Sequence, residues 1–522
     1  MNIHTVGELR AAGYRVRSVK DEMRENLLAA IARRQNTFPG IHGYERTVIP
    51  AIHNAILSKH DIILLGLRGQ AKTRILRSLT ALLDERIPIV EGCEINDSPF
   101  EPSCKRCRRL AADKGDDLPV AWMHRDERYR EKLATPDVTV ADLVGDIDPI
   151  KAANQRLTYA DEEVIHYGII PRTNRGIFAV NELPDLAPRI QVALLNILEE
   201  RDLQIRGFPI RIPMDIVLVF SANPEDYTSR GNIITPLKDR IDSQILTHYP
   251  QSVETAMQIT GQEAWLDRAQ QIELDVPDYV RSLVERIAFV ARESELVDQS
   301  SGVSARLTIA AIELLQSNME RRAALTGDRY VFPRLSDLAM LLPAITGKVE
   351  MVYEGEQQGA EVVARKLIGL AVSKLFESKF PPVERAGTGG RERRYDVDAD
   401  DLDDAFAGRR VKKAPPREEP KKPAPQSDPA YDAILGWFVD GNKIILSDEQ
   451  PFAEFFRELQ RIPRLADTAR KYVQAKNDQE LAFWMEMILE GLHQALRLAR
   501  EDLDSTITFQ ELMKFNVLRT VK

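Results

Sequence analysis

The residues from Gly66 to Thr73, GLRGQAKT, have the composition of a phosphate-binding loop. They follow an apolar run, IILL, and precede a helical pattern that begins RILRS. Backbone N–H groups of such a loop hold phosphate oxygens, and in the pattern G-x-x-x-x-G-K-[ST] the lysine reaches the terminal phosphates while the hydroxyl binds Mg²⁺. The expected nucleotide-binding residues are Gly66, Gly69, Gln70, Ala71, Lys72, Thr73 and Arg74.

This loop departs from the pattern at Ala71, which stands where the second glycine is expected. If that position needs a positive φ, the Cβ atom costs about 1–2 kcal/mol, whereas a negative φ makes the substitution nearly free. Taken alone, the segment could also be a strand–turn–helix with an incidental Lys-Thr pair.

Short apolar runs alternate with helical patterns over residues 36–270 and predict the elements that position this loop. The runs are β-branched and almost free of charge, as expected for strands buried on both faces of a parallel sheet. The sequence therefore predicts an α/β sandwich. The strand candidates are Ile62–Leu65, Ile87–Val90, Ile177–Val180 and Ile216–Phe220.

Changes in composition divide the chain into five predicted parts. Residues 1–35 form a helical leader, in which Ser18 caps a helix from about Val19 to Arg34. The α/β domain at 36–270 is followed by an all-α domain at 271–383 and a disordered linker at 384–428. Residues 429–522 form a helical domain, whose apolar stripes at Phe452–Leu459 and Trp484–Ala495 indicate a bundle core or, alternatively, a surface that docks a partner.

Composition also excludes some classes of function. The net charge of −9 disfavours electrostatic binding of nucleic acid by the protein surface as a whole. There is no apolar run of about 18 residues, so no membrane span is expected. The charged start of the chain does not have the pattern of a signal peptide, which favours a cytoplasmic location.

Further segments resemble, in order, motifs of AAA+ ATPases, most closely those of the magnesium chelatase small ATPase subunit and the MoxR-type ATPases. The resemblance covers about residues 36–380 and implies a P-loop sandwich followed by a helical lid domain. The matching segments besides the loop are FPGIHG at 38–43, DLVGDIDPIKA at 142–152, HYGIIPRTNRG at 166–176, GIFAVNE at 176–182, a hairpin around Gly207, FSANP at 220–224, PLKDRI at 236–241 and SAR at 304–306.

The resemblance implies roles for these residues. Ile41 and Gly43 would contact adenine. The strand that ends in Asp-Glu in the family ends here in Asn181-Glu182, so Glu182 would orient or activate the attacking water. Asn181 and Thr73 would bind Mg²⁺, more weakly than an aspartate would, because an amide cannot neutralise charge.

Three more residues would complete the catalytic set. Asn223 is the expected polar sensor of the terminal phosphate, Arg240 the arginine finger that acts on a neighbour's ATP, and Arg306 a sensor in the all-α domain. The cofactors implied are ATP and Mg²⁺. The assembly implied is a homo-oligomeric ring, expected to be a hexamer, that remodels a partner or inserts a metal ion, with a separate adhesion-type (VWA) protein as the expected partner.

Three alternatives to this motor are weighed at this point. Ala71 and Asn181 are compatible with a nucleotide-gated scaffold that hardly hydrolyses ATP. A transcription-type AAA+ remodeller is disfavoured because the chain lacks a GAFTGA loop, and a DNA helicase because of the acidic charge.

All three cysteines of the chain lie close together in sequence, at Cys93, Cys104 and Cys107. The C-x-x-C spacing of the last two is that of zinc knuckles, and His124 would complete a tetrahedral Zn²⁺ site. Against this, there is no second C-x-x-C pair, so free cysteines in a variable insert are the alternative.

Overall fold

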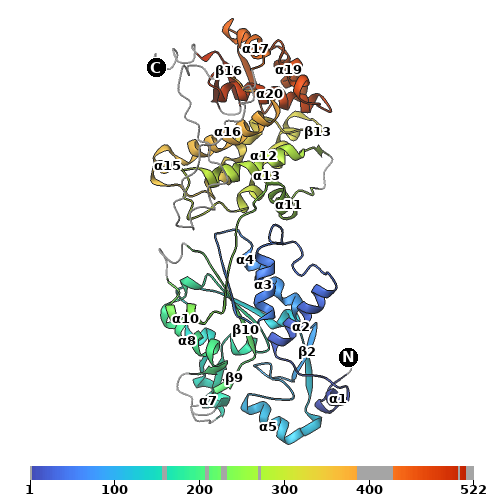
Figure 1. Cartoon of the computed structure of the whole chain (residues 1–522), viewed down its shortest axis with the longest axis vertical. Helices are drawn as coiled ribbons and strands as arrows, with labels where there is room; N and C mark the ends of the chain where they lie inside the picture. Colours follow the sequence, from blue (N-terminus) through green and yellow to red (C-terminus); the bar gives the residue numbers. More distant parts are fainter. Residues whose placement is uncertain are drawn as a thin grey trace, which may run out of the picture. The chain divides into compact units, whose positions relative to one another are not determined.

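The chain forms two compact units, seen in the computed structural model (Figure 1). The described residues are 3–155, 162–205, 211–224, 232–268, 272–384, 427–503 and 506–512. The first unit comprises residues 1–263, 297–307 and 348–352, and the second comprises 264–296, 308–347 and 353–522. Almost all of the predicted linker at 384–428 lies outside the described residues.

The first unit is built on a five-stranded parallel sheet with the order β11-β1-β10-β7-β4. In the register, Leu65 of β1 lies opposite Ala222 of β10, and Phe220 of β10 lies opposite Val180 of β7. This confirms the predicted α/β sandwich. The strands are β1 (Ile62–Leu65), β4 (Tyr129–Leu133), β7 (Gly176–Asn181), β10 (Ile216–Ala222) and β11 (Ser243–Leu246).

Successive residues of the central strands point to opposite faces of the sheet and build two hydrophobic cores. Ile62 and Leu64 belong to the core that the apolar faces of α2 and α3 cover, whereas Ile63 belongs to the core that α8 covers. The first unit's α-helices include α1 (Val6–Ala11), α2 (Val19–Ala32), α3 (Val48–Leu57), α4 (Lys72–Ser78), α5 (Lys105–Lys114), α6 (Val140–Leu143), α7 (Pro149–Gln155), α8 (Pro188–Glu199), α10 (Thr235–Arg240) and α11 (Val253–Glu263).

The predicted leader is part of this unit. Ser18 caps α2 by accepting a hydrogen bond from the Asp21 amide at 3.1 Å. Glu22 on α2 forms a bidentate ion pair with Arg128, with N–O distances of 2.6 and 2.7 Å, and both side chains are buried. This pair ties α2 to the segment that leads into β4.

One strand prediction was wrong in its placement. Residues Ile87–Val90 do form a strand, β2 (Arg86–Val90), but it pairs antiparallel with β3 (Val120–His124) in a separate two-stranded sheet. Pro88 lies in the middle of β2, and proline has no N–H to donate, so it is confined to edge strands. β2 therefore cannot be a central strand of the parallel sheet.

Shorter pieces complete the first unit. β5 (Gly145–Ile147) pairs with β6 (Ile165–Tyr167), and β8 (Asp202–Gln204) pairs antiparallel with β9 (Arg211–Pro213). The β8–β9 pair flanks the predicted hairpin around Gly207, and residues 206–210 lie outside the described residues. The 3₁₀ helices are Leu79–Leu82, Gly115–Asp117, Arg125–Arg128, Glu162–Val164, Pro171–Thr173 and Leu183–Asp185.

The second unit is mainly helical, and it joins the predicted all-α segment to the C-terminal block. The apolar stripes of the block are core: Phe455, Leu459 and Ile488 are buried. The block also contains an antiparallel sheet with the order β14-β16-β15, which helical periodicity did not predict. The elements are β12 (Glu273–Leu274), α12 (Asp278–Glu293), α13 (Arg306–Thr326, beginning in the first unit), β13 (Tyr330–Val331), a 3₁₀ helix (Leu335–Leu341), α14 (Leu342–Thr346), α15 (Tyr353–Gln358), α16 (Ala360–Lys379), α17 (Ala430–Val439), β14 (Ile444–Ser447), α18 (Phe452–Gln460), α19 (Leu465–Tyr472), α20 (Asp478–Gln494), β15 (Ala499–Leu503) and β16 (Thr506–Gln510).

Among the described residues, every helix is too short or too polar to cross a membrane.

Candidate functional site

The predicted site residues meet where three neighbouring strands end. The loop at 66–71 follows β1, Asn181 ends β7, and Asn223 follows β10. Because these strands are parallel and adjacent, their carboxyl ends lie at one edge of the sheet, which is where ligands bind in open α/β folds.

The loop at 66–71 turns through two residues with a positive φ. Gly69 has a φ of 73°, and Ala71 has a φ of 58° and a ψ of 15°, so the alanine lies in the left-handed region. A Cβ atom on Gly66 would collide with the side chains of Thr247 and Gln70, and one on Gly69 would collide with Ser304. Glycine is therefore required at both positions, and the alanine is strained.

The ammonium group of Lys72 is held at the centre of the site. It donates to the backbone oxygens of Gly66 and Leu67, the latter at 3.0 Å, and to Asn223 Oδ1 at 2.6 Å. Asn223 in turn donates from Nδ2 to Glu182 Oε2 at 3.0 Å. One hydrogen-bonded line thus joins three separate segments. Its middle member is the Asn223 amide, which bonds on one side to the Lys72 ammonium and on the other to the Glu182 carboxylate.

Glu182 also has an unusual backbone, with a φ of 56° and a ψ of 50°. Non-glycine residues in this region cost of order 1–3 kcal/mol and are concentrated at functional sites. The turn carries Glu182 out of the end of β7, and its amide lies 3.4 Å from Ser221 Oγ.

Asn181 and Thr73 are adjacent, as a shared Mg²⁺ site requires. Thr73 Oγ1 lies 3.4 Å from Asn181 Oδ1, which also accepts a hydrogen bond from Ser221 Oγ at 3.2 Å. A hydroxyl and an amide oxygen beside a lysine that can reach phosphates fit a hydrated Mg²⁺ ion bound together with a nucleotide, although they supply no charge of their own.

Sequence reasoning missed a carboxylate beside Asn181. Glu131 lies on β4, and its side chain hydrogen bonds with Asn181, Tyr129 and Arg77. The Arg77 guanidinium holds the pKa of Glu131 below its usual range, despite partial burial that opposes this. Negative charge is therefore present next to Asn181, on the neighbouring strand.

Ile41, Gly43 and Arg74 border the loop on another side. Ile41 is buried, Gly43 has a φ of 82°, and Arg74 forms an ion pair with Glu263 at the end of α11. Tyr44, also missed, donates its hydroxyl to the backbone oxygens of Gln70 and His248, at 3.0 and 2.8 Å.

These contacts fasten the 38–44 segment to the phosphate loop. Burial raises the pKa of Tyr44 from 10.0 to about 12, so the hydroxyl stays a donor even in moderately alkaline solution.

The two predicted arginines do not join this hydrogen-bonded line. Arg240, on α10, forms an ion pair with Glu199 of α8, with an N–O distance of 2.6 Å. Arg306 is exposed at the first position of α13. The line at Lys72 thus contains three of the predicted functional residues, and both arginines lie apart from it.

The cysteine prediction needs one correction. Cys93, Cys104 and Cys107 do come together, but the fourth group beside them is Asp97. His124 lies at the end of β3, where its Nδ1 atom is 3.2 Å from Asp126 Oδ2 and accepts from the Asp126 amide. The histidine caps the following 3₁₀ turn, which explains its presence without a metal.

Comparison with known families and structures bears on the α/β unit. Residues 120–241 match the AAA domain model of the dynein-related subfamily. Comparison of the sequence with curated proteins gives no match.

Several solved structures are similar to this chain at low sequence identity. A protein from Cytophaga hutchinsonii described as a candidate ATPase is 14% identical, with 69% of this chain and 97% of that one covered and a TM-score of 0.29. The BchI–BchD complex of magnesium chelatase gives 20% identity, coverage of 66% and 97%, and a TM-score of 0.29. NtrX from Brucella abortus in complex with ADP is 13% identical, with 71% of this chain and 67% of that one covered and a TM-score of 0.33.

The matched segment contains β4, β7 and β10, and with them Asn181, Glu182 and Asn223. The phosphate loop precedes it, on the strand that pairs with β10. The sequence match and the geometry of the sheet agree over residues 120–241, and together they show an AAA-type ATPase domain in the first unit.

Proposed function

We propose that this chain is the ATP-hydrolysing subunit of an AAA+ motor related to the magnesium chelatase and MoxR-type ATPases. One observation supports the proposal above all others: the line from Lys72 through Asn223 to Glu182, at the shared edge of β1, β10 and β7. It places the cation for the terminal phosphates, the polar sensor and the carboxylate within hydrogen-bond reach of one another.

Each group of the line has a role that its chemistry supports. The bound nucleotide with Mg²⁺ supplies the phosphoanhydride bond that is hydrolysed. Lys72 would then exchange its contacts with the loop carbonyls for phosphate oxygens, because a three-donor ammonium needs acceptors of either kind. Glu182 would orient the attacking water, and Asn223 would hold the carboxylate in place.

Arg240 would act in a ring, expected to be hexameric. It lies apart from the line within its own chain, as an arginine that serves a neighbouring subunit must, and its partner Glu199 is about half exposed. Such an arginine finger contributes roughly 10³–10⁵ in rate. Arg306, at the first position of α13, would sense the nucleotide, since the chain passes from the first unit to the second within this helix.

The work of the motor is to remodel a partner protein or to drive a metal ion into a target that the partner holds. The proposed partner is a separate protein with an adhesion-type (VWA) domain, and the proposed location is the cytoplasm. The proposed partner rests on the resemblance of the motifs to the chelatase and MoxR families.

A titration with a fluorescent ATP analogue tests the nucleotide site. Lys72→Ala should lose most of the affinity, because it removes the one side-chain cation in the Lys72–Asn223–Glu182 line. Lys379→Ala, at the exposed end of α16, is the matched control and should bind as the native chain does. If the Lys72 variant binds the analogue as tightly as the native chain, the loop at 66–73 is not the nucleotide site.

A second experiment tests the shared site. Mixing Arg240→Ala subunits with Glu182→Gln subunits should restore part of the ATPase activity, because some interfaces regain both groups. No recovery at any ratio, in assemblies shown to be mixed, would contradict a site formed by two subunits.

The alternative function is a nucleotide-gated scaffold. The left-handed Ala71 and the neutral Asn181 favour it, since both weaken the ordinary site. Steady-state ATP hydrolysis with and without a partner distinguishes the two functions: the scaffold would stay near background in both conditions.

A further inference from the structure

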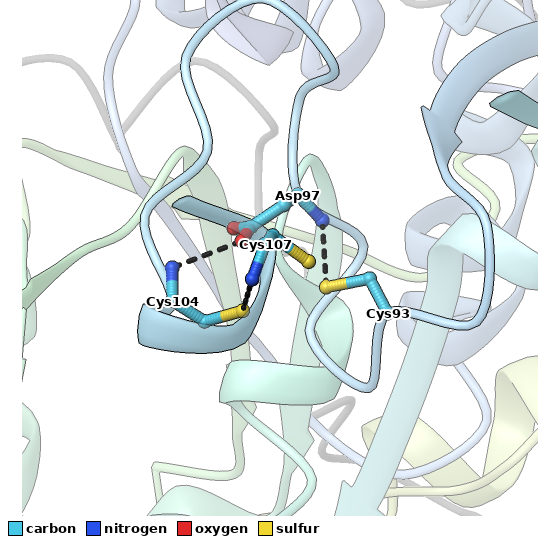
Figure 2. Close-up of side chains that lie close together, drawn as sticks. All are labelled: Cys93, Asp97, Cys104 and Cys107. Carbon is cyan, nitrogen blue, oxygen red and sulfur yellow. Dashed lines mark hydrogen bonds between the residues drawn. The ribbon is translucent and has the colours of Figure 1, made fainter. Parts of the chain in front are cut away.

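Four potential metal ligands gather in the first unit, away from the nucleotide site. Cys93 and Asp97 belong to the segment after β2, while Cys104 caps α5 and Cys107 lies in its first turn (Figure 2). One ligand atom from each of the four lies within 4.8 Å of all the others. Asp97, Cys104 and Cys107 are buried, and Cys93 is partly buried.

The separation fits a single tetrahedral ion. With Zn–S bonds of about 2.3 Å, the ligand atoms of a tetrahedron lie about 3.8 Å apart, so only a small contraction is required. The sulfur atoms that bind an iron–sulfur cluster lie farther apart than those that bind one ion. Thiolate-rich tetrahedral sites are typical of structural Zn²⁺.

Backbone hydrogen bonds hold two of the three sulfur atoms in place. The amide of Cys107 donates to Cys104 Sγ, and the amide of Asp97 donates to Cys93 Sγ, both at 3.3 Å (Figure 2). These bonds stabilise sulfur in its thiolate form. The start of α5, where Cys104 is the N-cap, also favours a negative charge.

Asp97 provides an independent indication of a ligand. Its Oδ2 atom accepts from the Cys104 amide at 2.9 Å, but Oδ1 is buried without a hydrogen-bond partner among the described residues. The residue is only 1% exposed. A buried, unpartnered carboxylate oxygen is costly, and a cation beside it removes that cost.

We propose that Cys93, Asp97, Cys104 and Cys107 bind one Zn²⁺ ion. Three thiolates and a carboxylate around Zn²⁺ leave a net charge of −2, and binding releases the thiol protons to solvent. Arg106, next to Cys107 on α5, donates to the Gly92 backbone oxygen at 2.6 Å, which brings a compensating positive charge to the segment that carries Cys93.

The ion would fix the 91–104 segment on the α/β core. Asn96 of this segment donates to the Arg172 backbone oxygen at 2.8 Å, and Asn174 donates to the Ile95 backbone oxygen at 3.1 Å. Both contacts reach the residues that lead into β7. The site is therefore structural, and it supports the start of the strand that ends in Asn181 and Glu182.

Elemental analysis of the full chain, purified without chelators, tests the proposal. We expect about one equivalent of zinc per chain, and its loss in Cys104→Ser. His124→Ala is the control and should keep the metal, because His124 lies outside the cluster. Asp97→Asn, of nearly the same shape, should weaken zinc retention against a competing chelator by about 10-fold or more, since the amide cannot supply the anionic oxygen.

A second measurement covers the case in which the cysteine variant fails to fold. Chelator-treated native chain should take up one equivalent of Co²⁺ and show the charge-transfer absorption of thiolate–cobalt bonds, which added Zn²⁺ displaces. Folded protein that is metal-free as purified and binds no Co²⁺ would overturn the proposal. So would a disulfide between two of the cysteines in the freshly purified chain, or zinc that is lost only in the His124 variant.

Discussion

Replacing Ala71 by glycine should stabilise the first unit, although the same replacement destabilises most helical positions. Ala71 immediately precedes α4 with a φ of 58° and a ψ of 15°. An L-residue with a side chain pays about 1–2 kcal/mol to occupy the left-handed region, and glycine pays nothing there.

The expected gain is smaller than this strain because glycine has more freedom in the unfolded chain. That freedom costs about 0.4–1 kcal/mol. Ala71 is exposed, so removal of its methyl group loses little burial. The net expectation for Ala71→Gly is a gain of about 0.5–1 kcal/mol in the free energy of unfolding of the first unit.

Urea unfolding, monitored by hydrogen exchange in peptides from the first unit, measures this gain in stability without interference from the second unit. Ala29→Gly is the matched control, since Ala29 is exposed within α2 and its replacement should cost about 0.5–1 kcal/mol. The two alanine-to-glycine substitutions should thus change the free energy of unfolding in opposite directions. A loss of stability in Ala71→Gly equal to that of the control would refute the left-handed conformation.

The remaining predictions concern buried charges and the metal at the nucleotide site. Burial raises the pKa of Glu486 to about 8, so the folded chain keeps a proton that the unfolded chain releases near the ordinary value of 4.5, and stability should fall as pH rises between these values. Glu486→Gln should flatten that slope in thermal unfolding, and an unchanged slope would contradict the assignment. Glu22→Gln leaves Arg128 charged and buried, and should cost about 3–5 kcal/mol in chemical unfolding, against less than about 1 kcal/mol for exposed ion pairs. Asn181→Asp adds a charge that can contact Mg²⁺ or its bound water, and should lower the Mg²⁺ concentration needed for half-maximal ATPase activity; an unchanged curve would place Asn181 away from the metal.

The central strands could be predicted because burial on both faces leaves a continuous apolar run. β1, β7 and β10 have that pattern and lie side by side. β4 has the sequence YREKL and lies at the edge of the sheet. Because an edge strand need not be buried on both faces, it lacks the continuous apolar run that predicts a strand. In β2, Pro88 was the available sign of an edge strand.

The meeting of Lys72, Asn223 and Glu182 at the candidate nucleotide site could be predicted from motifs, but the partners that support them could not. Lys72 and Glu182 are recognisable from short patterns within one segment. Ser221 and Glu131 reach Asn181 only because β10 and β4 flank β7, and strand order cannot be read from local spacing.

The cysteine cluster illustrates the same limit. Histidine is the usual companion of cysteine at zinc sites, which favoured His124 on sequence grounds. The fold instead brings Asp97 to the cluster, because the segment after β2 turns back towards α5. An aspartate at that spacing has no signature in the sequence.

Phosphate release by the full chain, with saturating Mg-ATP, tests the central claim most directly. The native chain should turn over ATP, while Glu182→Gln should bind the nucleotide with similar affinity and hydrolyse it roughly 10²–10⁴-fold more slowly, as expected when a general base is lost. Glu127→Gln, at an exposed position outside the site, should behave as the native chain does. Equal turnover in the native chain and the Glu182 variant would contradict the account, and so would a native chain that binds ATP without hydrolysing it.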